Sequence, residues 1–189
     1  MRPNGASGLL VSNISTFADY QKNQAWVWEH QALTRARFCA GDASVGKQFE
    51  EIRKRVISQP RNITALRREV ISMRHKMHEG HPNDSALFDI KHDSGGMVDI
   101  EFMVQFLVLA HAADHVELTA NSGNIALLNI AAKLNLISEN SSGTVANIYR
   151  DLRRIQHQLR LNNQTKCRIG REVIDTSPVT ILWKDLLGN

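Results

Sequence analysis

The spacing of apolar side chains along this 189-residue chain constrains its fold more than any other feature of the sequence. In several long stretches an apolar residue returns after three or four positions, which places these side chains on one face of an α-helix. Two unbroken stripes of this kind are Ile63, Leu66, Val70, Met73 and Met77, and Val145, Ile148, Leu152, Ile155 and Leu159. Strands would need a period of two, and the sequence offers little of it.

Local signals set the ends of the predicted helices. We expect helices from about residue 15 onward and near residues 45–56, 63–77, 97–113, 122–134, 144–163 and 177–187. Asn62 is expected to cap the helix that begins at residue 63. Ser122 is expected to cap the helix predicted to run through Leu134. Ser177 followed by Pro178 is a start signal for the last helix.

Several amphipathic helices joined by short links predict an all-α fold, a bundle of about six to eight helices. The helix from Met97 is apolar nearly all round, so we expect it to be buried at the centre. Short extended segments are expected at most at Leu9–Val11 and Phe88–Ile90. The first dozen residues contain Pro3, Gly5 and Gly8, which favour turns and suggest a start inside a larger protein.

Composition narrows the classes of function. An apolar share of 42% and a charged share of 22% describe an ordinary soluble globular protein. The two cysteines, Cys39 and Cys167, form no closely spaced pair, so neither a disulfide framework nor a zinc site is predicted and a cytoplasmic protein is expected. The most apolar stretch, residues 102–113, is too short to span a bilayer, so we expect no membrane contact.

The net charge of +4 has a local origin. Between Arg35 and Lys76 the chain has eleven Lys or Arg residues against four acidic ones. Such an excess is typical of solvated helix faces, but it also fits a basic surface for an anionic partner. A stand-alone basic module that binds RNA or an acidic protein is therefore one alternative for this chain.

The most unusual segment is FDIKHDSGGMVDIEF, residues 88–102. Gly95 and Gly96 precede a helix N-terminus, where exposed backbone N–H groups can bind a phosphate. Asp99 and Glu101 would repel that anion, and they suit an Arg, a Lys or a metal ion better. A simple entry turn with two acids at the helix start explains the same residues. However, a carboxylate in so apolar a helix must be paired or at the surface.

Other candidate sites are weaker. His75, His78 and His81 lie three residues apart, but no Cys or acid completes a metal site, and a solvated basic face explains them. Trp26 and Trp28 cannot point the same way on a helix, so we expect them to pack against different neighbours rather than to stack on bases. No motif of a nucleophilic hydrolase or a P-loop occurs, and we predict neither a catalytic residue nor a metal ligand.

The segment FDIKHDSGGMVDIEFMVQFLVLAHA, preceded by RPNGASGLLVSNISTFADYQKNQAWVWEHQALTRAR, resembles the C-terminal half of the bifunctional glutamine synthetase adenylyltransferases. The resemblance runs from Arg2 to about Leu136 and more loosely to Asn189. In this family each of two nucleotidyltransferase domains is followed by a helical domain similar to that of PII uridylyltransferase. The resemblance implies that residues 1–14 are a remnant of the second catalytic domain and that residues 15–189 are its helical bundle, with a sub-boundary near residues 80–88.

The resemblance also implies a function. In the family this half transfers AMP from ATP, with Mg²⁺, to a tyrosine of glutamine synthetase, and the other half removes it. The PII protein and glutamine set the balance between the two activities. The carboxylates that hold Mg²⁺ lie upstream of Arg2 in the family, so this chain alone is expected to be inactive and to bind neither ATP nor metal. The residues expected to support or face the catalytic cleft are Arg2, Lys91, Gly95, Gly96, Asp99 and Glu101. Nucleic acid is not an expected partner.

Overall fold

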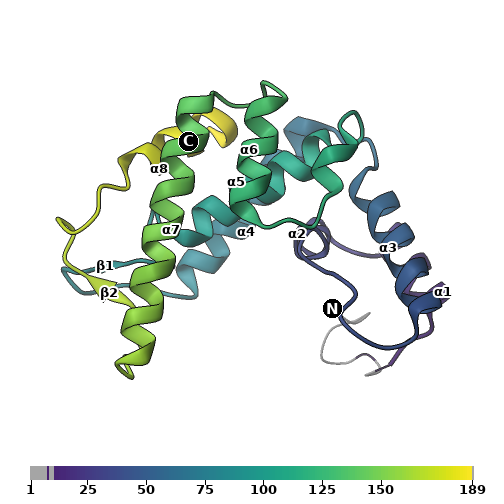
Figure 1. The fold of residues 1–189 in the computed structure, drawn as a ribbon, viewed down its shortest axis with the longest axis horizontal. Coiled ribbons are helices and arrows are strands. Elements are labelled where there is room, and N and C mark those ends of the chain that lie inside the picture. Colours follow the sequence, from purple (N-terminus) through teal and green to yellow (C-terminus); the bar gives the residue numbers. More distant parts are fainter. Residues whose placement is uncertain (1–7, 9–10, 189) are drawn as a thin grey trace. The chain divides into compact units, whose positions relative to one another are not determined.

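The computed structural model describes residue 8 and residues 11–188, and helices are the main secondary structure of this part of the chain (Figure 1). The α-helices are α1 (Ile14–Asn23), α2 (Val27–Leu33), α3 (Ala43–Ile57), α4 (Ile63–Glu79), α5 (Met97–His111), α6 (Asn124–Lys133), α7 (Glu139–Leu161) and α8 (Ser177–Leu187). A short 3₁₀ helix, η2, covers Val116–Thr119. The strands β1 (Phe88–Asp89) and β2 (Arg168–Ile169) have two residues each. The predicted all-α fold is confirmed.

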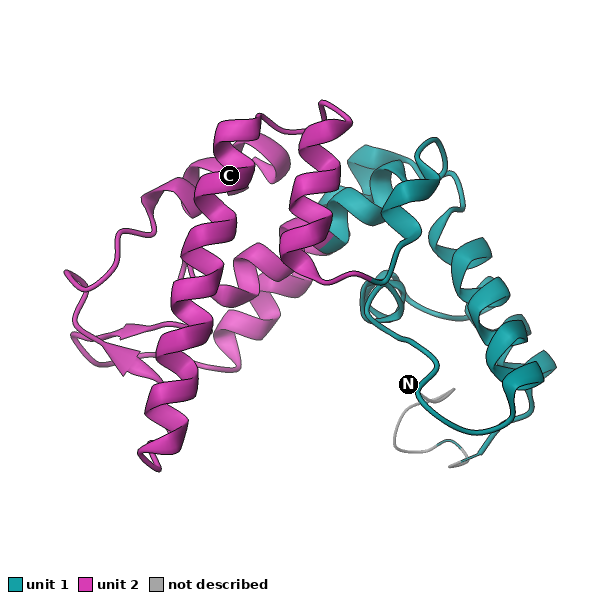
Figure 2. Ribbon diagram, viewed as in Figure 1, with its two compact units in different colours: residues 1–69, 105–121 teal, residues 70–104, 122–189 magenta. Residues whose placement is uncertain are grey.

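The chain divides into two compact units (Figure 2). Unit 1 contains Met1–Glu69 and Gln105–Asn121, and unit 2 contains Val70–Val104 and Ser122–Asn189. Both boundaries fall inside helices, so α4 and α5 each contribute to both units. The predicted remnant, residues 1–14, lies mostly outside the described residues, and that division of the chain stays a prediction.

Unit 1 begins with two helices, α1 and α2, in the stretch from about residue 15 onward where the sequence predicted helix. Asn13 caps α1 by accepting the N–H of Thr16 at 2.8 Å. The buried Glu29 accepts the backbone N–H of Trp26 at 2.9 Å, and this bond fixes the start of α2. Trp26 and Trp28 are 68% and 44% exposed, so the expectation that both pack against neighbours is wrong.

A buried histidine joins three segments of unit 1. One ring nitrogen of His30 lies 2.9 Å from the carbonyl oxygen of Gln21, and the other lies 3.2 Å from the guanidinium of Arg61. Burial lowers the pKa of His30 below its ordinary value, and the charge of Arg61 lowers it further. Burial also lowers the pKa of Arg61, to about 10. His30 is therefore neutral at pH 7, with one nitrogen donating to Gln21 and the other accepting from Arg61.

This arrangement predicts that unit 1 loses stability on acidification. Because the folded pKa of His30 is below the unfolded value of about 6.5, the unfolded chain binds more protons between these two values. Stability is thus fully present above about pH 6.5 and falls as the pH drops toward the folded pKa. In thermal melts, the midpoint of His30→Gln should fall less between neutral and mildly acidic pH than that of wild type. His157→Gln, at an exposed histidine, should keep the wild-type pH dependence.

Unit 2 is organised around the long helix α7, which contacts α6 and α8. Ser138 accepts the N–H of Ser141 at 3.0 Å, so α7 begins at Glu139, five positions before the predicted start. The cap of α6 is Gly123, with φ of +86°, and the prediction of Ser122 as the cap is wrong. The strands pair antiparallel, with Phe88 opposite Ile169, and bring the segment before α5 beside the segment after α7.

Helix α5 is buried around its circumference, as the sequence predicted. In unit 2 the side chains of Val98, Ile100 and Met103 are at most 4% exposed, and in unit 1 those of Phe106 and Leu109 are at most 2% exposed. Within the described residues, no helix combines the length and the apolar character needed to cross a bilayer.

Candidate functional site

The segment before α5 forms a turn that its own acidic side chains hold together. Asp89 accepts the backbone N–H groups of Lys91 and His92, both at 3.0 Å. Asp93 accepts the N–H of Asp89 at 2.9 Å and the side-chain amide of Asn83 at 2.7 Å. These bonds give residues 89–93 a fixed path into the two glycines.

Both glycines are needed for geometric reasons. Gly95 has φ of +83°, in the left-handed region, and a Cβ there would lie 2.6 Å from the hydroxyl oxygen of Thr176. A Cβ on Gly96 would lie 2.8 Å from the carbonyl oxygen of Asp93, 3.0 Å from that of Ile90 and 3.1 Å from that of Lys91. Because these contacts at Gly96 are to backbone, they cannot be relieved by a side-chain rotation.

Gly96→Ala is therefore expected to lower the free energy of unfolding by about 1 to 3 kcal/mol, the usual cost of overpacking. The matched control is Gly143→Ala in α7, where a Cβ would meet nothing within 4 Å. That change should stabilise the chain by about 0.5 to 1 kcal/mol, because Ala favours helix over Gly. Urea denaturation measures both, and equal effects of the two variants would contradict the crowding at Gly96.

Asp99 has the cationic partner that its place in an apolar helix predicted. One carboxylate oxygen accepts the Nε–H of Arg74, from α4, at 2.5 Å. The other oxygen accepts the backbone N–H of Gly95 at 2.7 Å. Arg74 also donates to the carbonyl oxygen of His92 at 2.8 Å. Both charged side chains are 6% exposed, so this pair ties α4, the glycine turn and the start of α5 together out of water.

The same contacts decide between the interpretations of the glycine turn. The carboxylate of Asp99 occupies the N–H of Gly95 that a phosphate would need. The glycine turn therefore leads into α5, and the carboxylate of Asp99 closes it by accepting the N–H of Gly95. Arg74 neutralises that carboxylate. We refer to Arg74, Asp99 and Gly95 below as the clamp.

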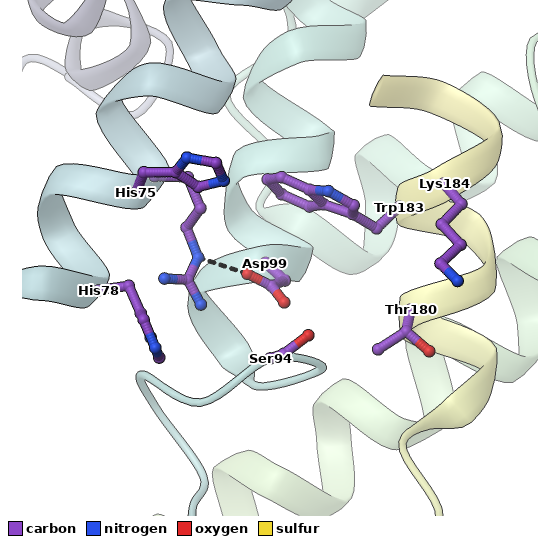
Figure 3. Close-up of a pocket in the computed structure, with 8 residues that line it drawn as sticks. His75, His78, Ser94, Asp99, Thr180, Trp183 and Lys184 are labelled. Carbon is purple, nitrogen blue, oxygen red and sulfur yellow. Dashed lines mark hydrogen bonds and ion pairs between the residues drawn. The ribbon is translucent and has the colours of Figure 1, made fainter. Parts of the chain in front are cut away.

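Two members of the clamp, Arg74 and Asp99, line a pocket in unit 2 (Figure 3). The pocket has a volume of about 260 Å³ and is lined by residues of α4, the glycine turn, α5 and α8: Arg74, His75, His78, Ser94, Asp99, Thr180, Trp183 and Lys184. Figure 3 shows Asp99 and the α4 histidines facing Trp183, Thr180 and Lys184 across it. Since Asp99 neutralises Arg74, the other polar groups that line the pocket are the Lys184 ammonium, two imidazoles and two hydroxyls, beside the indole of Trp183. Of these, the Thr180 hydroxyl donates to the carbonyl oxygen of Ser177 at 2.8 Å, and the His78 ring lies 3.3 Å from the carbonyl oxygen of His92.

Glu101 has a different environment from Asp99. The hydroxyl of Tyr149, on α7, donates to its carboxylate at 2.8 Å, and the side-chain amide of Asn124 donates to the same hydroxyl at 2.8 Å. The partner of Glu101 is therefore a hydroxyl, whereas the sequence predicted an Arg, a Lys or a metal ion. Its contacts connect α5 to α6 and α7, away from the glycine turn.

The remaining predicted residues do not join the clamp. Lys91 is exposed and lines a second pocket. Arg2 lies outside the described residues. His75 and His78 line the first pocket, but the ring of His81 stacks on that of His92, with centroids 4.0 Å apart. Whether any of these residues supports a catalytic cleft stays a prediction.

Sequence reasoning missed Arg74, Trp183 and Lys184 as members of the site. Arg74 had a usable signal, because it lies four positions after Val70 and so projects from the same side of α4 as the buried stripe. A basic residue at such a position needs a partner, and Asp99 is it. Nothing local to α8 indicates that Trp183 and Lys184 face the glycine turn.

The donor set gives no place for a catalytic metal ion. In residues 11–188, no three His, Cys, Asp or Glu side chains come close enough together to hold one. The acids of the glycine turn are already bound to backbone N–H groups or to Arg74. The described residues therefore do not fit the Mg²⁺ ion that nucleotidyl transfer requires.

Two family models match the chain. The model of glutamate-ammonia ligase adenylyltransferase matches residues 1–52, and that of GlnD PII-uridylyltransferase matches residues 61–167, which is more than half of the chain. Curated relatives match along the full length. One relative is a bifunctional glutamine synthetase adenylyltransferase/adenylyl-removing enzyme from Nitrosomonas europaea. The sequence identity is 56%, and the match covers all of this chain and 22% of the relative. Proteins of the same name match all of this chain at 52% identity in Aromatoleum aromaticum and 48% in Nitrosomonas eutropha.

The chain spans about a fifth of the length of these relatives. It has the all-helical fold expected of their helical portion, and the glycine turn lies inside the part that the uridylyltransferase model matches. On these matches, the chain belongs to the family of glutamine synthetase adenylyltransferases and PII-uridylyltransferases.

Proposed function

We propose that this chain is the helical portion of an enzyme that adenylylates and deadenylylates glutamine synthetase, with ATP as the AMP donor, in the control of nitrogen metabolism. The identity of 48–56% over all of this chain, which matches about a fifth of the bifunctional glutamine synthetase adenylyltransferase/adenylyl-removing enzymes, supports the proposal. The same matches give no support to the alternative of a stand-alone module for RNA or an acidic protein. Glutamine synthetase and the PII protein are the proposed partners of the longer enzyme, and the cytoplasm is its proposed location.

The chemistry of AMP transfer is proposed to reside outside the described residues. Transfer needs carboxylates that hold Mg²⁺ against the phosphates of ATP. Residues 11–188 offer no such cluster, and we derive no catalytic step from them. The role left to this chain is to position the catalytic portion of a longer protein and to present surfaces to its partners.

The clamp is the observation that carries this supporting role. A buried ion pair is costly to assemble, because both charges must leave water, and it is a poor way to gain stability alone. Here it fixes the path of one specific segment, the glycine turn, against α4 and α5 at the edge of a pocket. Such precision is useful where a neighbouring active site must keep its geometry.

The proposal predicts a clear difference between two proteins. With glutamine synthetase, ATP and Mg²⁺, this 189-residue chain alone should incorporate no labelled AMP, since its described residues offer no carboxylate cluster for the metal. A longer protein that joins this chain to the catalytic portion of a relative should incorporate AMP into a tyrosine. Transfer by the chain alone at a rate near that of the longer protein would show that the active site has been misplaced.

A further inference from the structure

Unit 2 contains a second pocket, separate from the clamp, with a volume of about 270 Å³. Its lining residues come from the C-terminal half of α7, the β1–β2 pair, the turn after β1, and His81 and Pro82 after α4. Asp89 and Arg168 both line the pocket, and their antiparallel pairing brings together two segments that are far apart in the sequence. Neither the clamp nor the proposed function uses this pocket.

The pocket has an excess of positive charge. Four basic side chains line it, Lys91, Arg160, Lys166 and Arg168, against the single carboxylate of Asp89. That carboxylate is held by two backbone N–H groups and lies nearest to Arg168, with 3.8 Å between Oδ2 and Nε. Within residues 11–188, Lys91, Arg160 and Lys166 have no carboxylate within ion-pair distance. The pocket therefore has three basic groups available for an anion.

Arg168 adds a donor that is not satisfied by the protein. Its Nε is buried and has no hydrogen-bond acceptor among the described residues. The 3.8 Å to Asp89 is too long for a hydrogen bond. A buried guanidinium N–H without an acceptor is costly. Arg168 also lines the pocket, so a bound oxyanion would lie near a guanidinium that the protein leaves partly unsatisfied.

Of the four basic side chains in this pocket, only Arg160 has a position that helix stability explains. Arg160 lies in the last turn of α7, where the helix dipole favours a cation. Lys91, Lys166 and Arg168 lie on the turn and on the strand region instead. Thr165 and His92 add neutral donors to the lining. Burial, and then the neighbouring His81, lower the pKa of His92 below its ordinary value.

We propose that Lys91, Arg160, Lys166 and Arg168 form a binding site for the phosphate group of a small anionic ligand. Arginine and lysine side chains bind phosphate through charge-assisted hydrogen bonds, and a concave basic site concentrates such anions. The volume is slightly below the range of pockets for drug-sized ligands, so it suits a small ligand that carries a phosphate group. The phosphate comes either from the free anion or from a small phosphomonoester.

The test is an amide NMR titration of the whole 189-residue chain with inorganic phosphate, at ionic strength kept constant with chloride. We expect saturable shifts at Lys91 and at residues 165–168, with a dissociation constant on the order of 1 mM. A second arm uses glycerol 3-phosphate, with glycerol as its control. Tighter binding of glycerol 3-phosphate than of phosphate assigns the site to a phosphomonoester, and equal or weaker binding assigns it to the free anion.

Two exposed lysines of the pocket allow variants that spare the core. Lys91→Ala and Lys166→Ala should each weaken phosphate binding about tenfold, as expected for one charge-assisted hydrogen bond. Lys133→Ala, at an exposed lysine of α6 that does not line the pocket, should bind as wild type does. Shifts that chloride reproduces, shifts that do not saturate, or wild-type affinity in both pocket variants would overturn the proposal.

Discussion

Asp99→Asn is expected to lower the free energy of unfolding of this chain by about 3 to 5 kcal/mol, the usual cost of breaking a buried ion pair from one side. The change leaves the charge of Arg74 buried without a counter-charge. It also disturbs the hydrogen bonds, because the two carboxylate oxygens each accept one N–H, from Arg74 and from Gly95. An amide has one oxygen, so its NH₂ group must face one of these donors.

The matched control is Asp151→Asn on α7. Asp151 also pairs with an arginine, at 3.2 Å from Arg154, but its side chain is 47% exposed and that of Arg154 is 70% exposed. Exposed pairs contribute about 0.2 to 1 kcal/mol, so this variant should remain close to wild type. Urea denaturation followed by far-UV circular dichroism gives both values. A loss below about 1 kcal/mol in Asp99→Asn would mean that the pair is not buried as described.

A double variant separates the pair from its surroundings. Arg74→Met removes the other charge, and combining it with Asp99→Asn removes the uncompensated charge that each single variant leaves behind. The double variant should therefore lose about 2 kcal/mol less than the sum of the two single losses, within the range of directly coupled residues. Strict additivity would contradict a direct interaction between the two side chains.

The features that sequence predicted well depend on residues close together in the chain. Asn62 does cap α4, accepting the N–H of Ala65 at 2.9 Å, and α8 begins at Ser177 before Pro178. A helical stripe and a cap each involve a few neighbouring residues, so their pattern is visible without knowing the fold. The need of Asp99 for a cationic partner was also predictable, because burying an unpaired carboxylate is unfavourable.

The features that could not be predicted depend on how helices pack. Arg74 is 25 residues from Asp99, and Tyr149 is 48 residues from Glu101. Nothing near Glu101 distinguishes a hydroxyl partner from a basic one, since the choice is made by which face of α7 meets α5. Strand β2 could not be predicted either, because two residues are too few to show an alternating pattern. Only the fold reveals that Arg168 lies beside Asp89.

The largest functional effect is expected when Asp99→Asn is placed in the longer enzyme. If the clamp braces the portion that binds ATP and glutamine synthetase, loosening the glycine turn displaces reacting groups that must be held precisely. A displacement of about 1 Å can reduce a rate roughly 100-fold, even when the change lies far from the reacting atoms. Because the variant is also less stable, the rate must be measured at a temperature well below its melting midpoint.

The most direct test is therefore the rate of AMP transfer to glutamine synthetase by the longer enzyme carrying Asp99→Asn, beside wild type and Asp151→Asn. Tryptophan fluorescence on the same samples verifies that each protein is folded during the assay. A bracing role for the clamp predicts a rate reduced roughly 100-fold in Asp99→Asn and an unchanged rate in Asp151→Asn. A wild-type rate in folded Asp99→Asn would contradict it and would leave the clamp as a helix entry with no part in catalysis.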